Sequence, residues 1–160
     1  FNNDPGQAVI LGSLYSSKQT PPYELTAENY TRGIVTKEEM KLTFDEENKI
    51  ITIETPGNNK ITINDKEKGI TLTDQNSNKI MMNDSGITIE SAKDLTLKAK
   101  MNVNVESGTA TNLKAKTDLK AEGMNVEIKA KTTLKAQGTA SAELSASGQT
   151  TVKGAMVMIN

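Results

Sequence analysis

The chain of 160 residues contains no histidine, no cysteine and no tryptophan. Without cysteine there are no disulfides and no thiol nucleophiles, and without cysteine and histidine together most zinc sites are excluded. Without histidine there is no imidazole for acid–base chemistry and no Ser-His-Asp triad. We therefore expect no catalytic residue, no metal site and no cofactor, and hence no enzyme.

Large apolar side chains are also scarce. Aromatic residues make up 3% of the chain and apolar residues of all kinds 35%. Aromatic side chains supply much of the buried area of an ordinary core, so this chain has little with which to build a core alone. The composition favours a protein that buries its apolar surface against a partner, such as further copies of itself.

The formal net charge of −1 argues against a nucleic-acid partner, because such binders carry a basic excess. No run of about 18 apolar residues is present, so no membrane-spanning helix is predicted. From Lys93 to Lys135 nine lysines stand against five acids, which we interpret as a solvated face. The first residues, FNNDPG, lack an initiator methionine, and we interpret the chain as a fragment of a longer protein.

Apolar or small residues occupy every second position along most of the chain from Ile51 onward. A period of two is typical of β-strands with one buried face. The parity of this alternation changes directly after Gly69, Gly86 and Gly123, and glycine tolerates the backbone of a bulge or kink. We predict strand kinks at these three glycines. Gly138 shows no parity change, so we expect Gly123→Val to disturb the structure more than Gly138→Val.

The segment LKAKTDLKAEG at 113–123 and its copy IKAKTTLKAQG at 128–138 consist of residues that favour helices. On a helix, however, Leu113 and Leu119 would lie about 240° apart and share no face. On a strand they lie on one face together with alanines and threonine, and the lysines lie on the other. Both copies are therefore predicted to be extended.

The larger residues of the presumed inner face recur about every eight residues, with one step of seven at Gly123, which indicates a repeat architecture. A hairpin meander would need strong turn signals, and these are missing after Gly86. Eight residues are too few for a single chain to close around its own core, whereas three chains could each contribute one side. We therefore favour an intertwined homotrimeric, triple-stranded β-helix over a monomeric solenoid. The repeating residues are Ile89, Leu97, Val105, Leu113, Ala121, Ile128, Ala136, Leu144 and Val152.

Three segments resemble the valine-glycine repeat protein G (VgrG) family. GSLYSSKQTPPYE (12–24) resembles the end of its oligonucleotide/oligosaccharide-binding (OB) fold, residues 59–99 with GITLTD and GITIES resemble the start of its β-helical needle, and the closing VMIN resembles its tip. The expected fold is all-β. Its parts are a C-terminal OB-fold remnant at 1–24, a linker at 25–44 that has room for a turn or two of helix, and a triple-stranded β-helix spike at 45–160.

The resemblance implies the membrane-puncturing central spike of a contractile injection system, as in type VI secretion, phage tails and phage tail-like particles. The implied partners are two further copies of the chain, tube and hub proteins, a tip protein with proline-alanine-alanine-arginine (PAAR) repeats, effectors and, transiently, the target membrane. Such a spike assembles on a baseplate in the bacterial cytoplasm and is then ejected to the extracellular space or the target cell. The family's N-terminal hub domains are missing from this sequence.

The last residues form an apolar cluster, Met156, Val157, Met158 and Ile159, followed by Asn160. Chain ends are usually polar, so three copies of this cluster would make an apolar patch suited to docking a tip protein. The alternative is that these residues only close the core. No effector extension follows them in this sequence, so we expect any toxin to arrive on a partner.

A second class of function stays open, namely a trimeric fibre or adhesin stalk, or a β-solenoid that binds a ligand through Thr-x-Thr arrays such as Thr109-Ala110-Thr111. Several other threonines are expected on the inward face, which argues against such a ligand site. The stretch DQNSN at 74–78 begins like a calcium loop. Lys79 occupies the sixth position and Ser85 the twelfth, where a calcium loop needs glycine and glutamate, so a polar turn is expected there.

Overall fold

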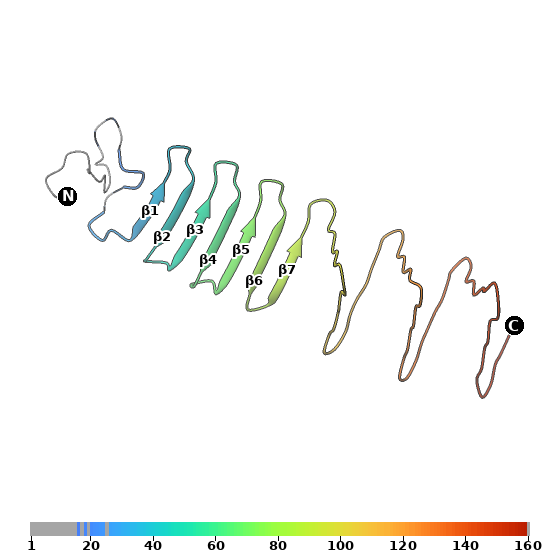
Figure 1. Ribbon diagram of the computed structural model, residues 1–160. Helices are drawn as coiled ribbons and strands as arrows, with labels where there is room; N and C mark the ends of the chain where they lie inside the picture. Colours follow the sequence, from blue (N-terminus) through green and yellow to red (C-terminus); the bar gives the residue numbers. More distant parts are fainter. Residues whose placement is uncertain (1–15, 17, 19, 25, 160) are drawn as a thin grey trace, which may run out of the picture. The chain divides into compact units, whose positions relative to one another are not determined.

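The computed structural model describes residues 16, 18, 20–24 and 26–159 (Figure 1). These residues contain β-strands and no helix, so the predicted all-β class is confirmed. One unit ends at Val103 and a second begins at Asn104. The strands, all in the first unit, are β1 (Thr31–Val35), β2 (Lys41–Asp45), β3 (Ile50–Glu54), β4 (Lys60–Asn64), β5 (Gly69–Thr73), β6 (Lys79–Asn83) and β7 (Gly86–Glu90).

The seven strands form one sheet in the order of the sequence, and each is antiparallel to the next. This β-meander was not expected from the sequence, which was interpreted as one long alternating strand with kinks. β1, β3 and β5 begin at residues 31, 50 and 69, and β2, β4 and β6 begin at 41, 60 and 79. The hairpin repeat is therefore 19 residues long.

Loop length explains why the alternation changes parity. Five-residue loops at 36–40, 55–59 and 74–78 alternate with shorter loops of four residues, and of two residues at 84–85. When a loop has an even number of residues, two residues that face each other across the hairpin have one odd and one even number. Gly69 and Gly86 each open a strand directly after an even loop. At these two glycines the chain therefore reverses direction through a turn, instead of kinking within one strand as predicted.

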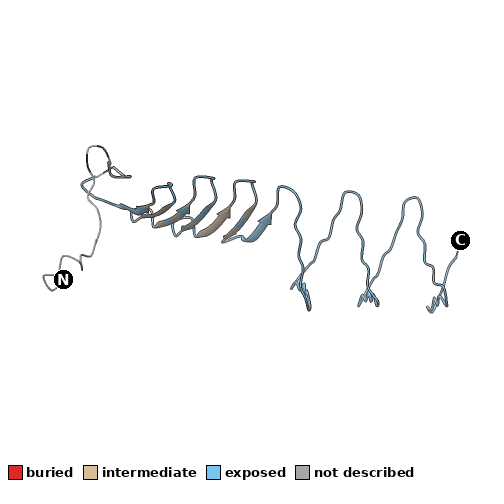
Figure 2. Cartoon of the chain, turned by 45° about the horizontal axis from the view of Figure 1, so that its top comes forward, coloured by how far each residue is buried: buried red, intermediate tan, exposed pale blue. Residues whose placement is uncertain are grey.

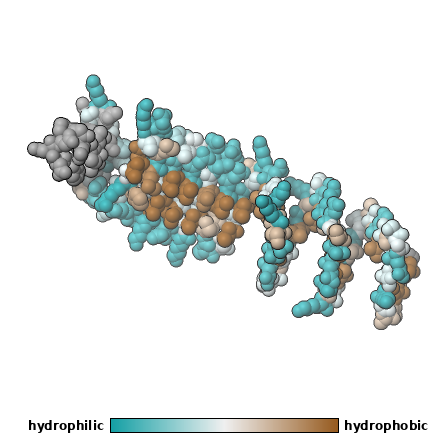
Figure 3. Space-filling view, in the orientation of Figure 1, coloured by the Kyte–Doolittle hydropathy of each residue, from teal (hydrophilic) through white to brown (hydrophobic). Residues whose placement is uncertain are grey.

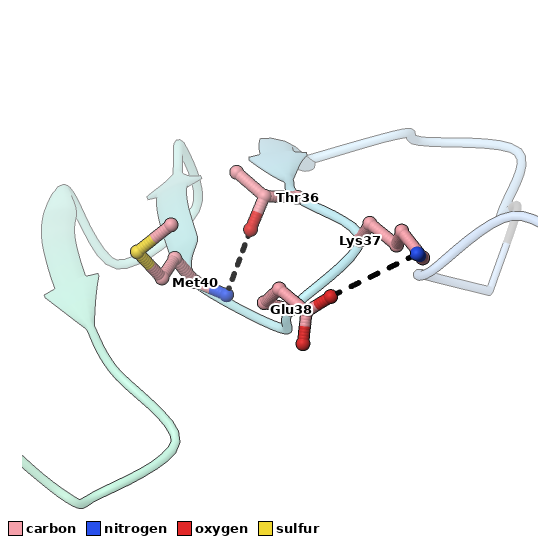
Figure 4. A network of polar contacts seen from close by, with 4 residues as sticks. All are labelled: Thr36, Lys37, Glu38 and Met40. Carbon is pink, nitrogen blue, oxygen red and sulfur yellow. Dashed lines mark hydrogen bonds and ion pairs between the residues drawn. The ribbon is translucent and has the colours of Figure 1, made fainter.

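The five-residue loops share one turn geometry, which Figure 4 shows for residues 36–40. The backbone N–H of Glu39 donates to the carbonyl oxygen of Thr36 at 3.0 Å, and the N–H of Met40 donates to Thr36 Oγ1 at 3.1 Å. Glu39 takes a positive φ of 61°, and Asn58 and Ser77 take 64° and 68° at the same place in the next two loops. Residues other than glycine thus occupy the left-handed position, so the glycine that usually marks such a position in a sequence is missing.

β1 and most of β2 lie within residues 25–44, the predicted linker, so this stretch contributes strands to the sheet and no turn of helix. Just before it, Tyr23 Oη lies 2.8 Å from Thr43 Oγ1 of β2. The ring lies so close to Gly33 that a Cβ there would meet Tyr23 Oη at 2.7 Å. Most of the predicted OB-fold remnant at 1–24 lies outside the described residues, so that boundary stays a prediction.

From residue 91 to 159 the backbone is extended and bent, without assigned strands; we call this segment the coil. Its bends fall at 92–93, 100–101, 108–109 and so on to 155–156, at steps of eight residues. The single step of seven separates the bends at 124–125 and 131–132, directly after Gly123. The bends reproduce the period of eight seen in the sequence, including its one shorter step. The role of Gly123 as a kink stays a prediction.

Candidate functional site

One face of the meander carries two rows of apolar side chains, because residues that pair across each hairpin point to the same side of the sheet. Figure 3 shows these rows as a continuous hydrophobic band over the strands. The first row runs Ile34, Leu42, Ile53, Ile61, Leu72, Ile80 and Ile89, and the second runs Arg32, Phe44, Ile51, Ile63, Ile70, Met82 and Ile87. We call this surface the apolar face.

Nothing in the described part of the chain covers the apolar face. No residue there is buried (Figure 2), and even in the middle of the sheet Ile63 keeps 39% of its surface exposed and Ile53 keeps 47%. The whole chain exposes 16186 Å². A compact monomer of its 17.3 kDa would expose only about 7,800 Å². A surface of this kind requires a partner.

The opposite face of the sheet is polar. Its central row contains Thr43, Thr52, Thr62, Thr71 and Thr88, and the row beside it alternates in charge where Lys41, Glu54 and Lys60 oppose one another on β2, β3 and β4. Opposite charges on facing positions favour strand pairing and keep a face solvated. The two faces differ in the way expected of a sheet that packs on one side only.

Within the described chain the coil makes no backbone–backbone hydrogen bonds. All backbone–backbone hydrogen bonds outside the strands lie between residues 30 and 78, so none joins one part of 91–159 to another. Its apolar side chains include ones far more exposed than Ile63 at 39% or Ile53 at 47% in the middle of the sheet, such as Leu113 at 74% and Ile128 at 70%. Its uncovered apolar groups are unfavourable in water, and other chains could cover them. Its N–H and C=O groups meet water in the single chain and would have to be paired with those chains once they are buried.

Asparagines at equivalent places fasten successive five-residue loops to one another. Asn59 Oδ1 accepts the backbone N–H of Gln75 at 3.3 Å, in the next such loop. Nineteen residues on, Asn78 Oδ1 accepts the N–H of Ala92 at 3.1 Å and Ser91 Oγ at 3.2 Å. Asn78 therefore links the last five-residue loop of the meander to the first bend of the coil.

The expected polar turn at 74–78 is present. Asp74 Oδ1 accepts the N–H groups of Asn76 and Asn78 at 2.9 and 2.8 Å, and Oδ2 accepts their side-chain amides at 3.1 and 2.8 Å. The Asn78 amide is the largest cause of a lowered pKa of Asp74, from 3.8 to about 2. Both carboxylate oxygens are thus occupied by amides of the same loop, and the described residues contain no cluster of three or more potential metal ligands.

Acid should therefore weaken this loop. Because the folded pKa of Asp74 lies below its ordinary value of 3.8, its stabilising contribution is complete above that value and is lost as the pH falls through about 2. We expect Asp74→Asn to lower the thermal midpoint at pH 7 and to flatten its fall between pH 4 and 2, measured by circular dichroism. Asp65→Asn is the control, since that carboxylate makes no hydrogen bond among the described residues. Equal acid profiles for wild type and Asp74→Asn would contradict this role.

The residues predicted for the tip are exposed: Met156 by 80%, Met158 by 78% and Ile159 by 91%, with Val157 less so. Asn160 lies outside the described residues. No described helix is both long and apolar enough to cross a membrane.

The glycines of the coil leave different amounts of room for a side chain, in the opposite order to the sequence-based expectation, which stays a prediction. A Cβ on Gly138 would overlap the carbonyl oxygen of Ser141 and lie 2.7 Å from its carbon. A Cβ on Gly123 would only approach the carbonyl oxygen of Asn125 to 3.3 Å. Gly138 is therefore the position where a side chain forces the backbone to move. The alternation pattern missed this because the obstacle is the carbonyl group of Ser141, three residues further along and just past the bend at 139–140, which leaves side-chain parity unchanged.

Sequence reasoning also missed the charged end of the second row. Arg32 lies on the apolar face, and its Nη1 is 3.1 Å from Glu46 Oε1. The available signal was the 19-residue repeat, which aligns Arg32 with Ile51 and Ile70.

Comparison with known proteins agrees with an assembling β-structure. Residues 50–111 match the model of the phage baseplate V C-terminal trimerisation domain. This range holds β3 to β7 and the first bends of the coil. No curated protein matches the chain. The match covers less than half of the chain and supports a likeness to trimeric, structural domains of phage-baseplate spikes.

Proposed function

We propose that this chain is the needle of a homotrimeric central spike in a contractile injection system of the VgrG type. The observation that carries the proposal is the apolar face, which nothing described covers and most of which lies in the range matched to a trimerisation domain. A fibre or adhesin stalk would need the same trimer, but the matched domain is one of phage baseplates, which favours the spike.

Three copies would cover the apolar face of each sheet and would provide backbone partners for each coil. Three apolar faces turned toward one axis would bury the two rows of each sheet, and the polar faces would form the outside. In the coil, each eight-residue side would pair with sides of the other two chains, which gives an intertwined triple-stranded β-helix within 45–160. Ladders shared among three chains leave few free edges, so such a shaft would be stiff and would resist aggregation.

Sedimentation equilibrium tests the assembly directly. We expect a particle of three times 17.3 kDa that persists on dilution. A monomer at micromolar concentration would contradict the spike, because the apolar face would then be free in solution. A stable dimer would contradict the threefold arrangement.

At the tip, the exposed cluster Met156, Val157, Met158 and Ile159 would present an apolar platform to a PAAR-type cap, and effectors would travel with that cap. The machine would assemble on a cytoplasmic baseplate in a bacterium and eject the needle through the target membrane. Tube and hub proteins would hold its other end.

We expect the double variant Met156→Asp and Met158→Asp to bind a PAAR-type cap protein roughly tenfold more weakly or worse, a change of about 1.4 kcal/mol, because two carboxylates replace apolar contacts. Pull-down with a purified cap, alongside the sedimentation mass, measures this. Thr151→Asp is the control. It adds a charge close to the tip, at an odd-numbered position that is expected to face away from the side on which Met156 and Met158 lie. Equal capture by the double variant would exclude the cluster as a docking site.

A further inference from the structure

We propose that Asn78 and Ser91 form a conformational switch that ends the meander. Residues 91–100 carry the pattern of one more five-residue loop and strand, and the contact between these two side chains holds that loop open. The chain therefore runs on into the coil at this point. The inference concerns the path of a single chain and does not depend on the proposed homotrimer.

Three contacts close each five-residue loop of the meander. The N–H of the first residue donates to the carbonyl oxygen of the fifth, and the N–H of the fourth donates to the carbonyl oxygen of the first, at 3.0 to 3.2 Å. The side-chain oxygen of the first residue also accepts a hydrogen bond from the fifth. A hydroxyl or carboxylate at the first position thus stabilises the closed loop. The first and fifth residues are Thr36 and Met40, Thr55 and Asn59, and Asp74 and Asn78.

The segment directly after β7 has the same signature. SAKDL at 91–95 matches TKEEM at 36–40 in having a hydroxyl first, an acid fourth and an apolar residue fifth. The fourth residue takes a positive φ in the closed loops, and Glu39 does so at 61°. Asp94 belongs to a residue type that also tolerates this conformation. Nothing in the residue types of 91–95 therefore prevents closure.

The residues that follow also fit a further strand. A loop closed at 91–95 would place Leu97 opposite Ile89 on the apolar face and Lys98 opposite Thr88 on the polar face. Each side chain would then lie on the face that suits it. The side-chain pattern permits an eighth strand, so another feature keeps the chain from folding back.

That feature is the direction of the Ser91 hydroxyl. None of the closing contacts joins residues within 91–95. Ser91 Oγ instead lies 3.2 Å from Asn78 Oδ1 and 2.9 Å from the carbonyl oxygen of Asp94, and its one proton serves both acceptors. Asn78 Oδ1 also accepts the N–H of Ala92 at 3.1 Å. The hydroxyl that would close the loop is thus drawn toward the loop before it.

The earlier loops lack this combination of side chains. Thr55 follows a loop that ends in Met40, whose side chain offers no amide oxygen. Asp74 follows a loop that ends in Asn59, but a carboxylate has no proton to donate to it. Among the described loops and the segment after β7, Ser91 is the one first residue that donates a side-chain proton to an asparagine of the preceding loop. The chain leaves the sheet where this pair occurs.

Cysteine pairs test the switch, because the chain has no cysteine of its own. The reporter is Ile89→Cys with Leu97→Cys, two positions that face each other only if the loop at 91–95 closes. The matched pair is Leu72→Cys with Ile80→Cys, which are partners across the preceding five-residue loop. Facing residues on antiparallel strands lie about 4.5–5.5 Å apart between Cα atoms, within reach of a disulfide.

Each pair is placed in the unchanged chain and in three variants. Ser91→Asp removes the hydroxyl proton and supplies a carboxylate like that of Asp74, and Asn78→Ala removes the acceptor. Asn59→Ala is the control, since it removes the equivalent asparagine of the preceding loop. Each full-length protein is refolded from denaturant at low protein concentration in an oxidising buffer. Free thiols are then alkylated, and intrachain disulfides are counted by mass spectrometry.

We expect about tenfold more of the 89–97 disulfide in Ser91→Asp and in Asn78→Ala, because the open form loses one or two hydrogen bonds. This disulfide should stay rare in the unchanged chain and in Asn59→Ala. The 72–80 disulfide should form in every background and so report a folded meander.

An 89–97 disulfide that is equally frequent in all backgrounds, or a response to only one of the two changes, would overturn the switch. If Asn78→Ala also loses the 72–80 disulfide, Ser91→Asp decides alone, because it lies outside the loop at 74–78. The sedimentation mass of the unchanged chain bears on the proposed homotrimer and not on the switch.

Discussion

Replacing Ile63 with aspartate should separate the assembly into monomers. Ile63 lies in the middle of the apolar face, between Ile51 and Ile70 on the neighbouring strands. In the trimer, three carboxylates would meet in one layer without a positive partner. Removing a buried aliphatic side chain and burying an unpaired charge each cost roughly 3 kcal/mol or more, and every chain bears that cost. We expect the sedimentation mass to fall to that of one chain.

The matched control is Thr62→Asp, one residue earlier on the same strand and on the polar face. It adds the same charge to β4 where the side chain meets solvent, so the trimer should survive with a change of stability below about 1 kcal/mol. If Thr62→Asp dissociated the particle while Ile63→Asp did not, the assignment of the two faces would be reversed.

Gly138→Ala should be the most disruptive alanine substitution among the coil glycines. The added Cβ would overlap the carbonyl oxygen of Ser141, so the bend at 139–140 would have to open. Overpacking against backbone costs about 1–3 kcal/mol per chain, and a trimer contains three such sites. A lower midpoint in guanidinium unfolding measures the effect.

Gly148→Ala serves as the comparison, because a Cβ there meets no atom within 4 Å. Removing glycine from an extended segment also restricts the unfolded chain, so this variant should be neutral or slightly more stable. Equal loss of stability in both variants would show that the Ser141 contact does not decide the outcome. A greater loss of stability for Gly123→Ala than for Gly138→Ala would instead support the prediction from the alternation pattern, in which Gly123 is the more sensitive position.

The sequence predicted the side-chain pattern better than the chain path. Alternation identified which residues share a face, from Phe44 and Ile51 through to Ile89, because the period of two holds within every strand whichever loop joins it to the next. The positions of the turns could not be predicted from the sequence. Residues such as Glu39 and Lys49 take positive φ without being glycine, and hydrogen bonds from neighbouring loop residues hold them there. Gly69 and Gly86, the visible glycines, mark the strands that follow the loops.

The candidate site was predicted in part for a related reason. Exposed apolar residues that need a partner are visible in composition and periodicity. The hydrogen bonds by which Asn59 and Asn78 join loops, and the ion pair of Arg32 with Glu46, depend on residues that come together only when hairpins stack. A repeat of 19 residues with conserved loop lengths is the feature from which those pairs can be found.

The contrast between meander and coil sets the order in which such a needle can form. Every strand pair of the meander joins neighbours in the sequence, so its hairpins close quickly and within one chain. In the described residues the coil makes no backbone–backbone hydrogen bond of its own, so in the proposed trimer it would become ordered only after three chains have met. Folding therefore has a direction. The meander gathers the chains in a step that depends on protein concentration, and the coil then winds from Ser91 toward the C-terminus at a rate independent of it.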